Sequence, residues 1–235
     1  MTSSASDHSD LNSSQIVAAY YSQHYDRLHT RGPLGRASAN FHKGLERPHI
    51  GKHYPQTLEL GAGNMTHFSF VRHSFDRYLM SDIRDAPQCD LLNRPDLEYR
   101  SMDAGALDLS DQSFDRVVAT CLILHLPDPL GALREWQRVC RSGGVVDYLV
   151  PCDPGVTSRL FRRMISEAIV GKHGVSREEY RLINALEHVS SFPRVWEISR
   201  QAVRPDNSLS IEFFPFSKVQ SWNINAYAIF RISVG

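Results

Sequence analysis

The chain has 235 residues, which is enough for one large domain with a buried core. Its 26 basic and 26 acidic side chains give a formal net charge of zero and form no basic stripe, so a nucleic acid is not the expected partner. No stretch approaches about 18 consecutive apolar residues and the N-terminus carries no apolar leader. The sequence therefore predicts a cytoplasmic protein without a membrane partner. The four cysteines lack a C-x-x-C spacing, and no metal site is predicted.

The first part of the chain is rich in polar residues. Residues 1–11 are expected to form a disordered tail. A helix is predicted to begin at Asn12, which can cap it, and to continue as an amphipathic lid. Its apolar and aromatic stripe comprises Ile16, Val17, Tyr20, Tyr21, His24, Tyr25 and Leu28. The next segment, RGPLGRASANF at 31–41, contains glycines and a proline and predicts a loop, on which the helix can pack against a second copy of the chain to form a homo-oligomer.

From residue 57 onward, strand patterns alternate with helical patterns. Strands are predicted at 57–60, 78–83, 98–103, 115–124 and 144–151, with an amphipathic helix at 131–140. Further helices are predicted at 156–170, 176–189 and 193–203, and two closing strands at 208–216 and 223–232. Strands separated by helical segments predict a parallel sheet covered on both faces, to which the last two strands add an antiparallel hairpin.

The predicted fold class is therefore α/β: a Rossmann-like three-layer α/β/α sandwich with a mostly parallel seven-stranded sheet, an antiparallel C-terminal hairpin and an N-terminal lid helix. We expect a single domain over residues 12–235. Within it, 12–50 form the lid region, 51–155 the cofactor-binding core, 156–205 a helical cover over the substrate, and 206–235 the closing hairpin.

Residues 57–64 read TLELGAGN, which places an acidic residue two positions before a Gly-x-Gly. Such a run forms the turn after a buried parallel strand, where the glycines let backbone N–H groups approach a ligand because no Cβ stands in the way. Glu59 disfavours a pyrophosphate and favours a ligand that carries positive charge. The cofactor S-adenosylmethionine (SAM) has both a sulfonium and an amino group, and it fits this requirement.

Ligands of open α/β sheets bind beyond the carboxyl ends of the strands. Asp82 ends the second predicted strand, where a carboxylate can accept hydrogen bonds from ribose hydroxyls. Asp103 and Ala104 end the third, where a carboxylate and a backbone N–H can contact adenine. Residues 120–125 lie at and just past the end of the fourth, facing the reacting centre. Each aspartate alone is well explained as a helix cap or turn residue. Their joint placement after the acidic Gly-x-Gly turn is what indicates a methyltransferase.

The stretch from about 57 to 151 resembles the class I SAM-dependent methyltransferases of the small-molecule type, also called methyltransferase type 11. The resemblance lies in ELGAGN, the Asp82 strand end, MDA at 102–104, LDLSDQSFDRVVA at 107–119, LHLPDP at 124–129 and REWQRVCRSGGVV. It implies SAM as the cofactor and S-adenosylhomocysteine (SAH) as the product. The cofactor contacts that it implies are Glu59, Gly61, Ala62 and Gly63 for the methionine part, Asp82 for the ribose, Asp103 and Ala104 for the adenine, and Thr120 and Cys121 for the methionine amino end.

Two residues depart from what such a fold usually contains. Met65 stands where the family's first motif usually has a third glycine. Asp147 lies within the fifth predicted strand, and because a buried carboxylate needs partners, we expect it to make a structural hydrogen bond.

Methyl transfer is an in-line displacement, in which alignment of the reactants can contribute about 7–11 kcal/mol. A general base is needed only when the acceptor must lose a proton early. His125, which matches a histidine that commonly follows strand four in this family, and His188 are the predicted catalytic candidates, with His42 as a third. A structural role is an alternative for each. A nucleophilic Cys152 is disfavoured by the neutral charge and the absence of an RNA-binding extension.

The sequence thus predicts methyl transfer to a small-molecule acceptor, such as a specialised natural-product metabolite or a sugar. Oxygen, nitrogen and carbon all remain open as the methylated atom. Expected acceptor contacts are Tyr21, Tyr25, Phe216 and Trp222, which would also suit C-methylation of an aromatic or prenylated substrate. A non-catalytic ligand-binding protein on the same scaffold is the alternative. An NAD(P) oxidoreductase is disfavoured, because its fingerprint would require glycine in place of Thr66.

Overall fold

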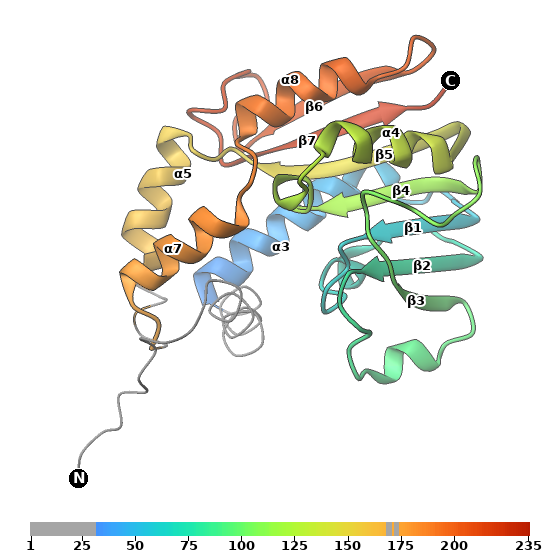
Figure 1. Cartoon of the computed structure of the whole chain (residues 1–235), viewed down its shortest axis with the longest axis horizontal. Helices are drawn as coiled ribbons and strands as arrows, with labels where there is room; N and C mark the ends of the chain where they lie inside the picture. Colours follow the sequence, from blue (N-terminus) through green and yellow to red (C-terminus); the bar gives the residue numbers. More distant parts are fainter. Residues whose placement is uncertain (1–31, 168–170, 172–173) are drawn as a thin grey trace.

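The computed structural model describes residues 32–167, 171 and 174–235, and its centre is one seven-stranded sheet (Figure 1). The strand order is β3-β2-β1-β4-β5-β7-β6. Strands β1 to β5 pair in parallel, and β7 runs antiparallel to both β5 and β6. The strands are β1 Gln56–Leu60, β2 Arg77–Asp82, β3 Leu97–Ser101, β4 Phe114–Thr120, β5 Cys140–Pro151, β6 Ser208–Phe214 and β7 Tyr227–Ser233. The predicted fold class and its closing hairpin are confirmed.

Helices cover both faces of the sheet (Figure 1). The α-helices are α3 Gly32–Glu46, α4 Pro129–Val139, α5 Val156–Phe161, α7 Arg177–Glu187 and α8 Phe192–Ala202. Short turns of helix are η2 Arg47–His49, η3 His67–Phe70, η4 Asp90–Asn93, η5 Ile123–His125 and the π-helical η6 Arg162–Ser166. The predicted tail and the lid helix from Asn12, with Tyr21 and Tyr25, lie outside the described residues, so these predictions stay untested.

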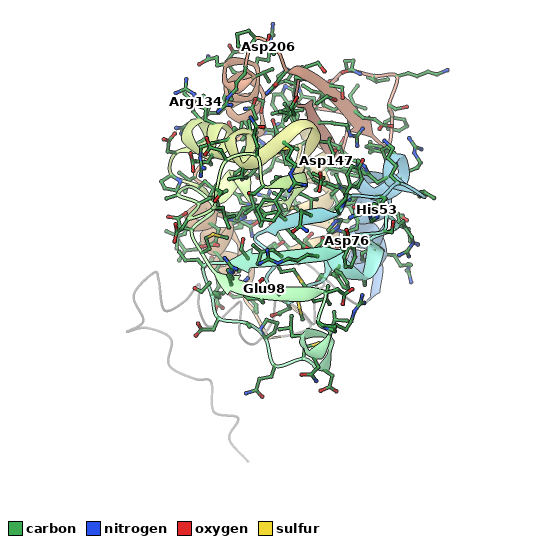
Figure 2. All side chains as sticks on the ribbon, turned by 90° about the vertical axis from the view of Figure 1, so that its right-hand side faces the viewer. His53, Asp76, Glu98, Arg134, Asp147 and Asp206 are labelled. Carbon is green, nitrogen blue, oxygen red and sulfur yellow. The ribbon has the colours of Figure 1, made fainter. Side chains whose placement is uncertain are left out.

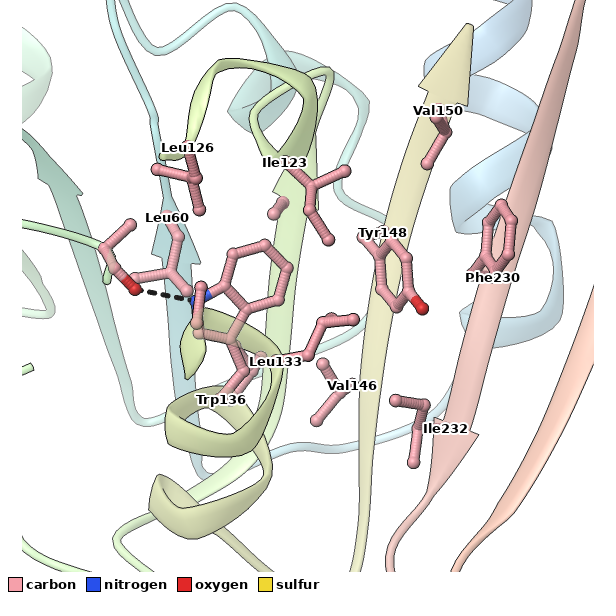
Figure 3. Packing of buried hydrophobic residues seen from close by; sticks show 14 of the residues in the cluster. Leu60, Ile123, Leu126, Leu133, Trp136, Val146, Tyr148, Val150, Phe230 and Ile232 are labelled. Atoms are coloured by element: carbon pink, nitrogen blue, oxygen red, sulfur yellow. Dashed lines mark hydrogen bonds between the residues drawn. The ribbon is translucent and has the colours of Figure 1, made fainter. Parts of the chain in front are cut away.

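Helix α4 shows how local sequence and packing agree. Asp128 caps it by accepting a hydrogen bond from the backbone N–H of Gly131 at 2.9 Å, and Pro129 occupies the first turn. Trp136 is fully buried against the sheet, where its ring lies 5.9 Å from that of Tyr148 (Figure 3). The apolar side of the helix thereby closes the main core.

The loop predicted at residues 31–41 is wrong over 32–41, because these residues belong to α3, and residue 31 lies outside the described residues. Pro33 lies in the first turn, where proline is tolerated. Each interior glycine costs a helix about 1 kcal/mol. Packing outweighs this cost, since the Phe41 ring lies 4.1 Å from that of Tyr227 and Leu45 is fully buried. Tertiary contacts, which the local composition does not reveal, therefore decide the helix.

The connections next to β2 also differ from the predicted alternation of strands and helices. The segment between β1 and β2 forms only η3, and the segment between β2 and β3 only η4. Helix α8 packs beside α4, and the Gln137 amide of α4 donates a hydrogen bond to the Ala202 carbonyl at 3.0 Å (Figure 1). The elements that lie beyond the carboxyl ends of the strands include η5, α5, η6 and α7.

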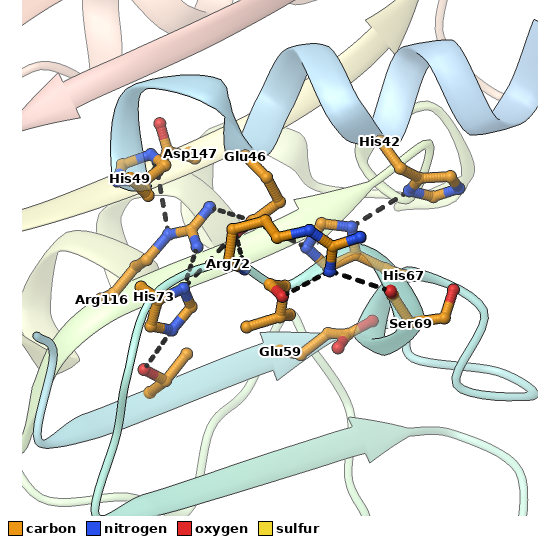
Figure 4. A network of polar contacts seen from close by, with 12 residues as sticks. His42, Glu46, His49, Glu59, His67, Ser69, Arg72, His73, Arg116 and Asp147 are labelled. Atoms are coloured by element: carbon orange, nitrogen blue, oxygen red, sulfur yellow. Dashed lines mark hydrogen bonds and ion pairs between the residues drawn. The ribbon is translucent and has the colours of Figure 1, made fainter. Parts of the chain in front are cut away.

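A buried network of ionic side chains joins α3 and η2 to the opposite face of the sheet (Figure 4). Arg116 of β4 is fully buried, with its guanidinium 2.7 Å from Glu46 and 3.2 Å from Asp147. It also donates a hydrogen bond to Nδ1 of His73 at 2.9 Å. Burial alone would raise the pKa of Glu46, but the hydrogen bond from His67 and the charge of Arg116 outweigh it, so this pKa lies far below its usual range.

Asp147 is the carboxylate for which the sequence predicts a structural hydrogen bond, and this prediction is confirmed. Figure 2 shows it inside the molecule, whereas Arg134 and Asp206 lie at the surface. His49 contacts its carboxylate at 2.8 Å, and Arg231 donates a hydrogen bond to it at 2.7 Å. Burial opposes ionisation of Asp147, yet these partners and Arg116 lower its pKa. The carboxylate is therefore ionised and holds η2 against β5.

Candidate cofactor and acceptor site

The turn after β1 has a left-handed backbone at both of its glycines. Gly61 and Gly63 adopt φ angles of +67° and +52°, a left-handed region that favours glycine. Met65, in place of the family's third glycine, takes the same region with φ 59°. Its side chain is buried beside Tyr78 and Met80, so packing compensates for the strained backbone. The turn keeps its shape without the third glycine.

Asp82, at the end of β2, lies against this turn. Its carboxylate accepts hydrogen bonds from the backbone N–H of Gly63 at 2.9 Å and from the guanidinium of Arg84 at 3.0 Å. Burial would raise the pKa of Asp82, but the Arg84 contacts and the Gly63 N–H lower it. The carboxylate is therefore ionised. The Arg84 side chain that makes this contact is half exposed.

Glu59 is more deeply buried than its predicted role as a cofactor contact suggests. Its side chain is fully buried on the α3 face, where Oε2 accepts a hydrogen bond from the Tyr78 hydroxyl at 2.8 Å. Oε1 has no hydrogen-bond partner among the described residues. Burial is the main cause that raises the pKa of Glu59. Because the carboxyl group is enclosed in this way, a contact between Glu59 and a cofactor stays a prediction.

The space above Gly63 lies between the turn and Asp82. A Cβ at this position would lie 3.0 Å from Nη2 of Arg84 and 3.9 Å from Oδ2 of Asp82, so a side chain would fill the cradle between turn and carboxylate. At Gly61, a Cβ would lie 2.9 Å from the Leu122 side chain. The residues present therefore fit a cofactor with a positively charged amino acid end and a ribose.

The remaining predicted cofactor residues lie at the same edge. Asp103 is exposed, and its Oδ1 accepts a hydrogen bond from the Gly105 N–H at 2.8 Å. Ala104 is buried, and its carbonyl accepts a hydrogen bond from the Trp136 indole at 2.9 Å (Figure 3). Thr120 ends β4, and Cys121 follows it in a left-handed conformation with φ 56°. The structure thus gathers the predicted cofactor residues around one edge of the sheet.

Neither cysteine near this edge is activated as a nucleophile. Burial raises the pKa of the Cys121 and Cys152 thiols to about 12. Both are therefore neutral thiols at pH 7, which agrees with the low weight that the sequence gives to covalent catalysis.

Two histidine–carboxylate pairs lie side by side beyond the carboxyl ends of β4 and β5. His125 of η5 has Nδ1 3.6 Å from Glu187, and His188 at the end of α7 has Nδ1 3.3 Å from Asp153. The two imidazole rings are 5.2 Å apart. Glu187 and His188 are adjacent in sequence, but each pairs with a different residue, as expected for neighbours on a helix. The pairs themselves are visible only in three dimensions.

Two members of this cluster, His125 and Asp153, have shifted pKa values. Burial is the main cause that lowers the pKa of His125, so its ring is neutral at pH 7. Burial opposes ionisation of Asp153, but the His188 hydrogen bond and Arg162, at 2.7 Å, lower its pKa to about 2. Asp153 and Arg162 are functional candidates that the sequence reasoning missed. The PCDPG segment at the end of β5 is a sequence signal that points to Asp153. No sequence signal points to Arg162, the partner of Asp153 on η6.

A cavity of about 270 Å³ adjoins the His188 pair. It is bounded by residues that follow β5, by η6, by α7 and by the start of α8. Two of its polar atoms, Asp153 Oδ1 and the Ser190 hydroxyl, have no partner among the described residues. The lining residues are Asp153, Pro154, Arg162, Arg181, Asn184, Ala185, His188, Ser190 and Ser191.

Trp222 and Phe216, the predicted acceptor contacts, and His42, the third catalytic candidate, lie in positions less suited to these roles. Trp222 packs near Phe192 within the core, with ring centroids 6.5 Å apart, whereas Phe216 is 52% exposed. His42 of α3 lies in the buried ionic network, where its Nδ1 is 3.0 Å from that of His67, and burial lowers its pKa to about 3. Its surroundings are those of a structural residue.

Comparison with known proteins agrees with this geometry. Residues 58–146 match the family model described as a methyltransferase domain. Over this stretch the chain is therefore similar to a methyltransferase domain. This finding confirms the predicted family and supports SAM as the cofactor.

One similar curated protein is the phosphatidylethanolamine N-methyltransferase of Cereibacter sphaeroides, 31% identical over 105 residues that cover 42% of this chain and 51% of that protein. This chain therefore spans about half the length of that relative. Among solved structures, one similar protein is a SAM-dependent methyltransferase of Thermotoga maritima, described as a possible histamine N-methyltransferase. The match has a TM-score of 0.62 at 13% identity and covers 94% of this chain and 100% of that chain.

The N-methyltransferase NodS of Bradyrhizobium japonicum, in complex with SAH, has a TM-score of 0.57 at 14% identity, covering 94% of this chain and 98% of that one. At such identities the two structures establish the fold alone. Within the described ranges, no helix is long and apolar enough to cross a bilayer.

Proposed function

We propose that this protein transfers the methyl group of SAM to a small-molecule acceptor. The observation that carries the proposal is the convergence at one sheet edge of the left-handed glycine turn, the ionised Asp82 and the two histidine–carboxylate pairs. The matching methyltransferase domain supports it. The proposed cofactor contacts are Glu59, Gly61, Ala62, Gly63, Asp82, Asp103, Ala104, Thr120 and Cys121.

The chain's own residues have two tasks in such a reaction. Bound SAM supplies an already activated methyl group, so the protein must hold it in line with the acceptor and exclude water. The glycine turn and Asp82 fix one end of the cofactor, and Ala104, held by Trp136, positions the loop proposed to contact adenine.

His125 and His188 are proposed to accept the proton that an O–H or N–H acceptor loses. Asp153 holds His188 through Nδ1, which turns Nε2 away from the carboxylate and leaves it as the atom for proton transfer. Nothing in the arrangement restricts the acceptor to oxygen or nitrogen, and a carbon acceptor would need no such base. A specialised metabolite or a sugar remains the proposed acceptor class, and the N-methyltransferase relative makes amines the first to assay.

The first experiment is calorimetric titration with SAH of wild type, Asp82→Ala and a matched control, Asp76→Ala. Asp76 is exposed and precedes the opposite end of β2. We expect one-to-one binding that Asp82→Ala weakens by about 10-fold to 100-fold, since hydrogen bonds to a charged group contribute roughly 1.5–3 kcal/mol. Wild-type protein that fails to bind SAH would contradict the proposal.

A second experiment tests the histidines. SAH release is measured with panels of amines, alcohols, sugars and aromatic carbon acceptors, for wild type, His125→Gln and His188→Gln. Loss of a general base is expected to lower kcat by about 10²–10⁴-fold with an O–H or N–H acceptor. SAH binding without turnover on any panel would favour the alternative, a non-catalytic ligand-binding protein on this scaffold.

A further inference from the structure

One surface of the molecule combines exposed apolar side chains with an excess of positive charge. Helix α5 continues directly into η6, over residues 156–166. Val156, Leu160 and Met164, spaced four residues apart and therefore on one helical face, are 55%, 56% and 65% exposed. Large apolar residues exposed together in this way on a soluble domain usually mark an interaction site.

The adjoining loop extends this apolar face. Thr157 donates hydrogen bonds to the carbonyls of Asn223 and Ile224, at 3.0 and 2.9 Å, which ties the start of α5 to the loop between β6 and β7. Ile224 is 48% exposed. We call the α5 surface the set formed by Val156, Arg159, Leu160, Arg163, Met164 and Ile224.

The charge of this surface is of one sign. Arg159 and Arg163 are exposed and flank the apolar stripe, and Lys218 is exposed on the loop. Residues 154–166 and 215–226 contain no acidic residue, although the whole chain carries as many acidic as basic side chains. The nearest acidic groups along the chain, Asp153 and Glu167, have side chains only 14% and 4% exposed, and each is paired with an arginine. Glu167 also attracts Arg163, so the positive charge of the surface comes mainly from Arg159 and Lys218 and in part from Arg163.

The α5 surface lies close to the proposed acceptor site. Figure 1 shows α5 at one end of the molecule, beyond the carboxyl ends of the strands. Arg162, on the same helix, lines the cavity that adjoins His188. A structure docked on the α5 surface would therefore lie next to the proposed acceptor site.

From this arrangement we infer that the α5 surface docks on an anionic lipid surface. A short amphipathic helix with apolar side chains on one face and arginines beside them lies in the plane of a membrane interface, where the apolar groups enter the acyl boundary and the arginines bind lipid phosphates. The contact is peripheral and needs no spanning segment, which agrees with the finding on the described helices. It revises the expectation from sequence of a protein without a membrane partner, and it is independent of the proposed methyl transfer.

The test is co-sedimentation of the full-length protein with vesicles. One set contains equal parts of phosphatidylglycerol and phosphatidylcholine, and the other contains phosphatidylcholine alone. We expect binding to the anionic vesicles only, and release by about 0.5 M salt, at which exposed charges are screened within a few ångströms. Absence of sedimentation with anionic vesicles, or equal sedimentation with both sets, overturns the proposal.

Two pairs of substitutions identify the surface. Leu160→Gln with Met164→Gln removes apolar contact, and Arg159→Glu with Arg163→Glu reverses charge. All four side chains are exposed, so the fold should tolerate the changes. Each pair is expected to lower the partition coefficient by about tenfold or more. The controls, Ile50→Gln and Arg200→Glu, change exposed residues elsewhere and should bind like wild type.

Other occupants of the α5 surface give different results. If both pairs of variants bind vesicles like wild type, the lipid contact lies elsewhere and the proposal fails. Light scattering without vesicles separates a second possibility: a dimer that the Leu160 and Met164 changes convert to a monomer would show that a second copy covers the surface. Either result would overturn docking on lipid by these residues.

Discussion

Arg116→Met is expected to lower the free energy of unfolding by about 3–5 kcal/mol at pH 7, the usual cost of removing one partner from a buried ion pair. The Arg116 guanidinium is fully buried between Glu46 and Asp147. Methionine retains most of the apolar stem, so the loss reports mainly the charge. Asp147 keeps Arg231 and Glu46 keeps His67, at 2.7 and 3.2 Å. These remaining partners place the expected loss near the lower end of the range, about 3 kcal/mol.

The loss should shrink as the pH falls. In the wild type, the lowered pKa values of Glu46 and Asp147 mean that their stabilisation is present above about pH 4 and disappears only as the pH falls through the folded-state values. Without Arg116 both pKa values rise, so protonation relieves the buried charge. The pKa values of His49 and His73 are lowered by burial first and also by Arg116. In the variant these histidines protonate more readily beside the carboxylates, which acts in the same direction.

Urea unfolding followed by circular dichroism at pH 7 and pH 5 measures both quantities. The control is Arg47→Met, the same substitution in the exposed pair with Glu212, whose atoms are 2.8 Å apart. That pair is expected to contribute about 0–1 kcal/mol, because solvent screens it. The reasoning is refuted if Arg116→Met costs less than about 1 kcal/mol at pH 7, or if the difference from wild type widens at pH 5.

Three substitutions test the turn and its support. Gly61→Ala places a Cβ 2.9 Å from Leu122 at a φ of +67°, so SAH affinity by calorimetry should fall by about fivefold or more, and unchanged affinity would contradict the assigned turn. Met65→Gly relieves about 1–2 kcal/mol of strain but removes a buried side chain that contributes about 2–5 kcal/mol, so the melting temperature should fall rather than rise. Trp136→Phe leaves the Ala104 carbonyl without its indole donor and should cost about 1–3 kcal/mol in urea unfolding, a loss that an unchanged midpoint would disprove.

The sequence by itself determined the elements whose signals are local. The strand end at Asp82, the presence of a helix after β4 and the closing hairpin all follow from residues close together in the chain. The fourth strand, expected to reach 124, ends at Thr120 instead, and α4, expected from 131, begins at Pro129 after its Asp128 cap. Such features arise from turn geometry, capping and the alternation of buried positions, which act over a few residues. The cofactor turn belongs to the same group, because an acidic residue before Gly-x-Gly is a local pattern.

Only the tertiary structure decided the rest. Helix α3 exists because Phe41 and Leu45 pack on other elements, although its glycines and proline indicate a loop. Asp147 acquires its partners from η2, β4 and β7, and His188 acquires Asp153 from the end of β5. Such pairings depend on which segments the folded sheet brings together. No local pattern encodes them, because the partners are joined through space rather than along the chain.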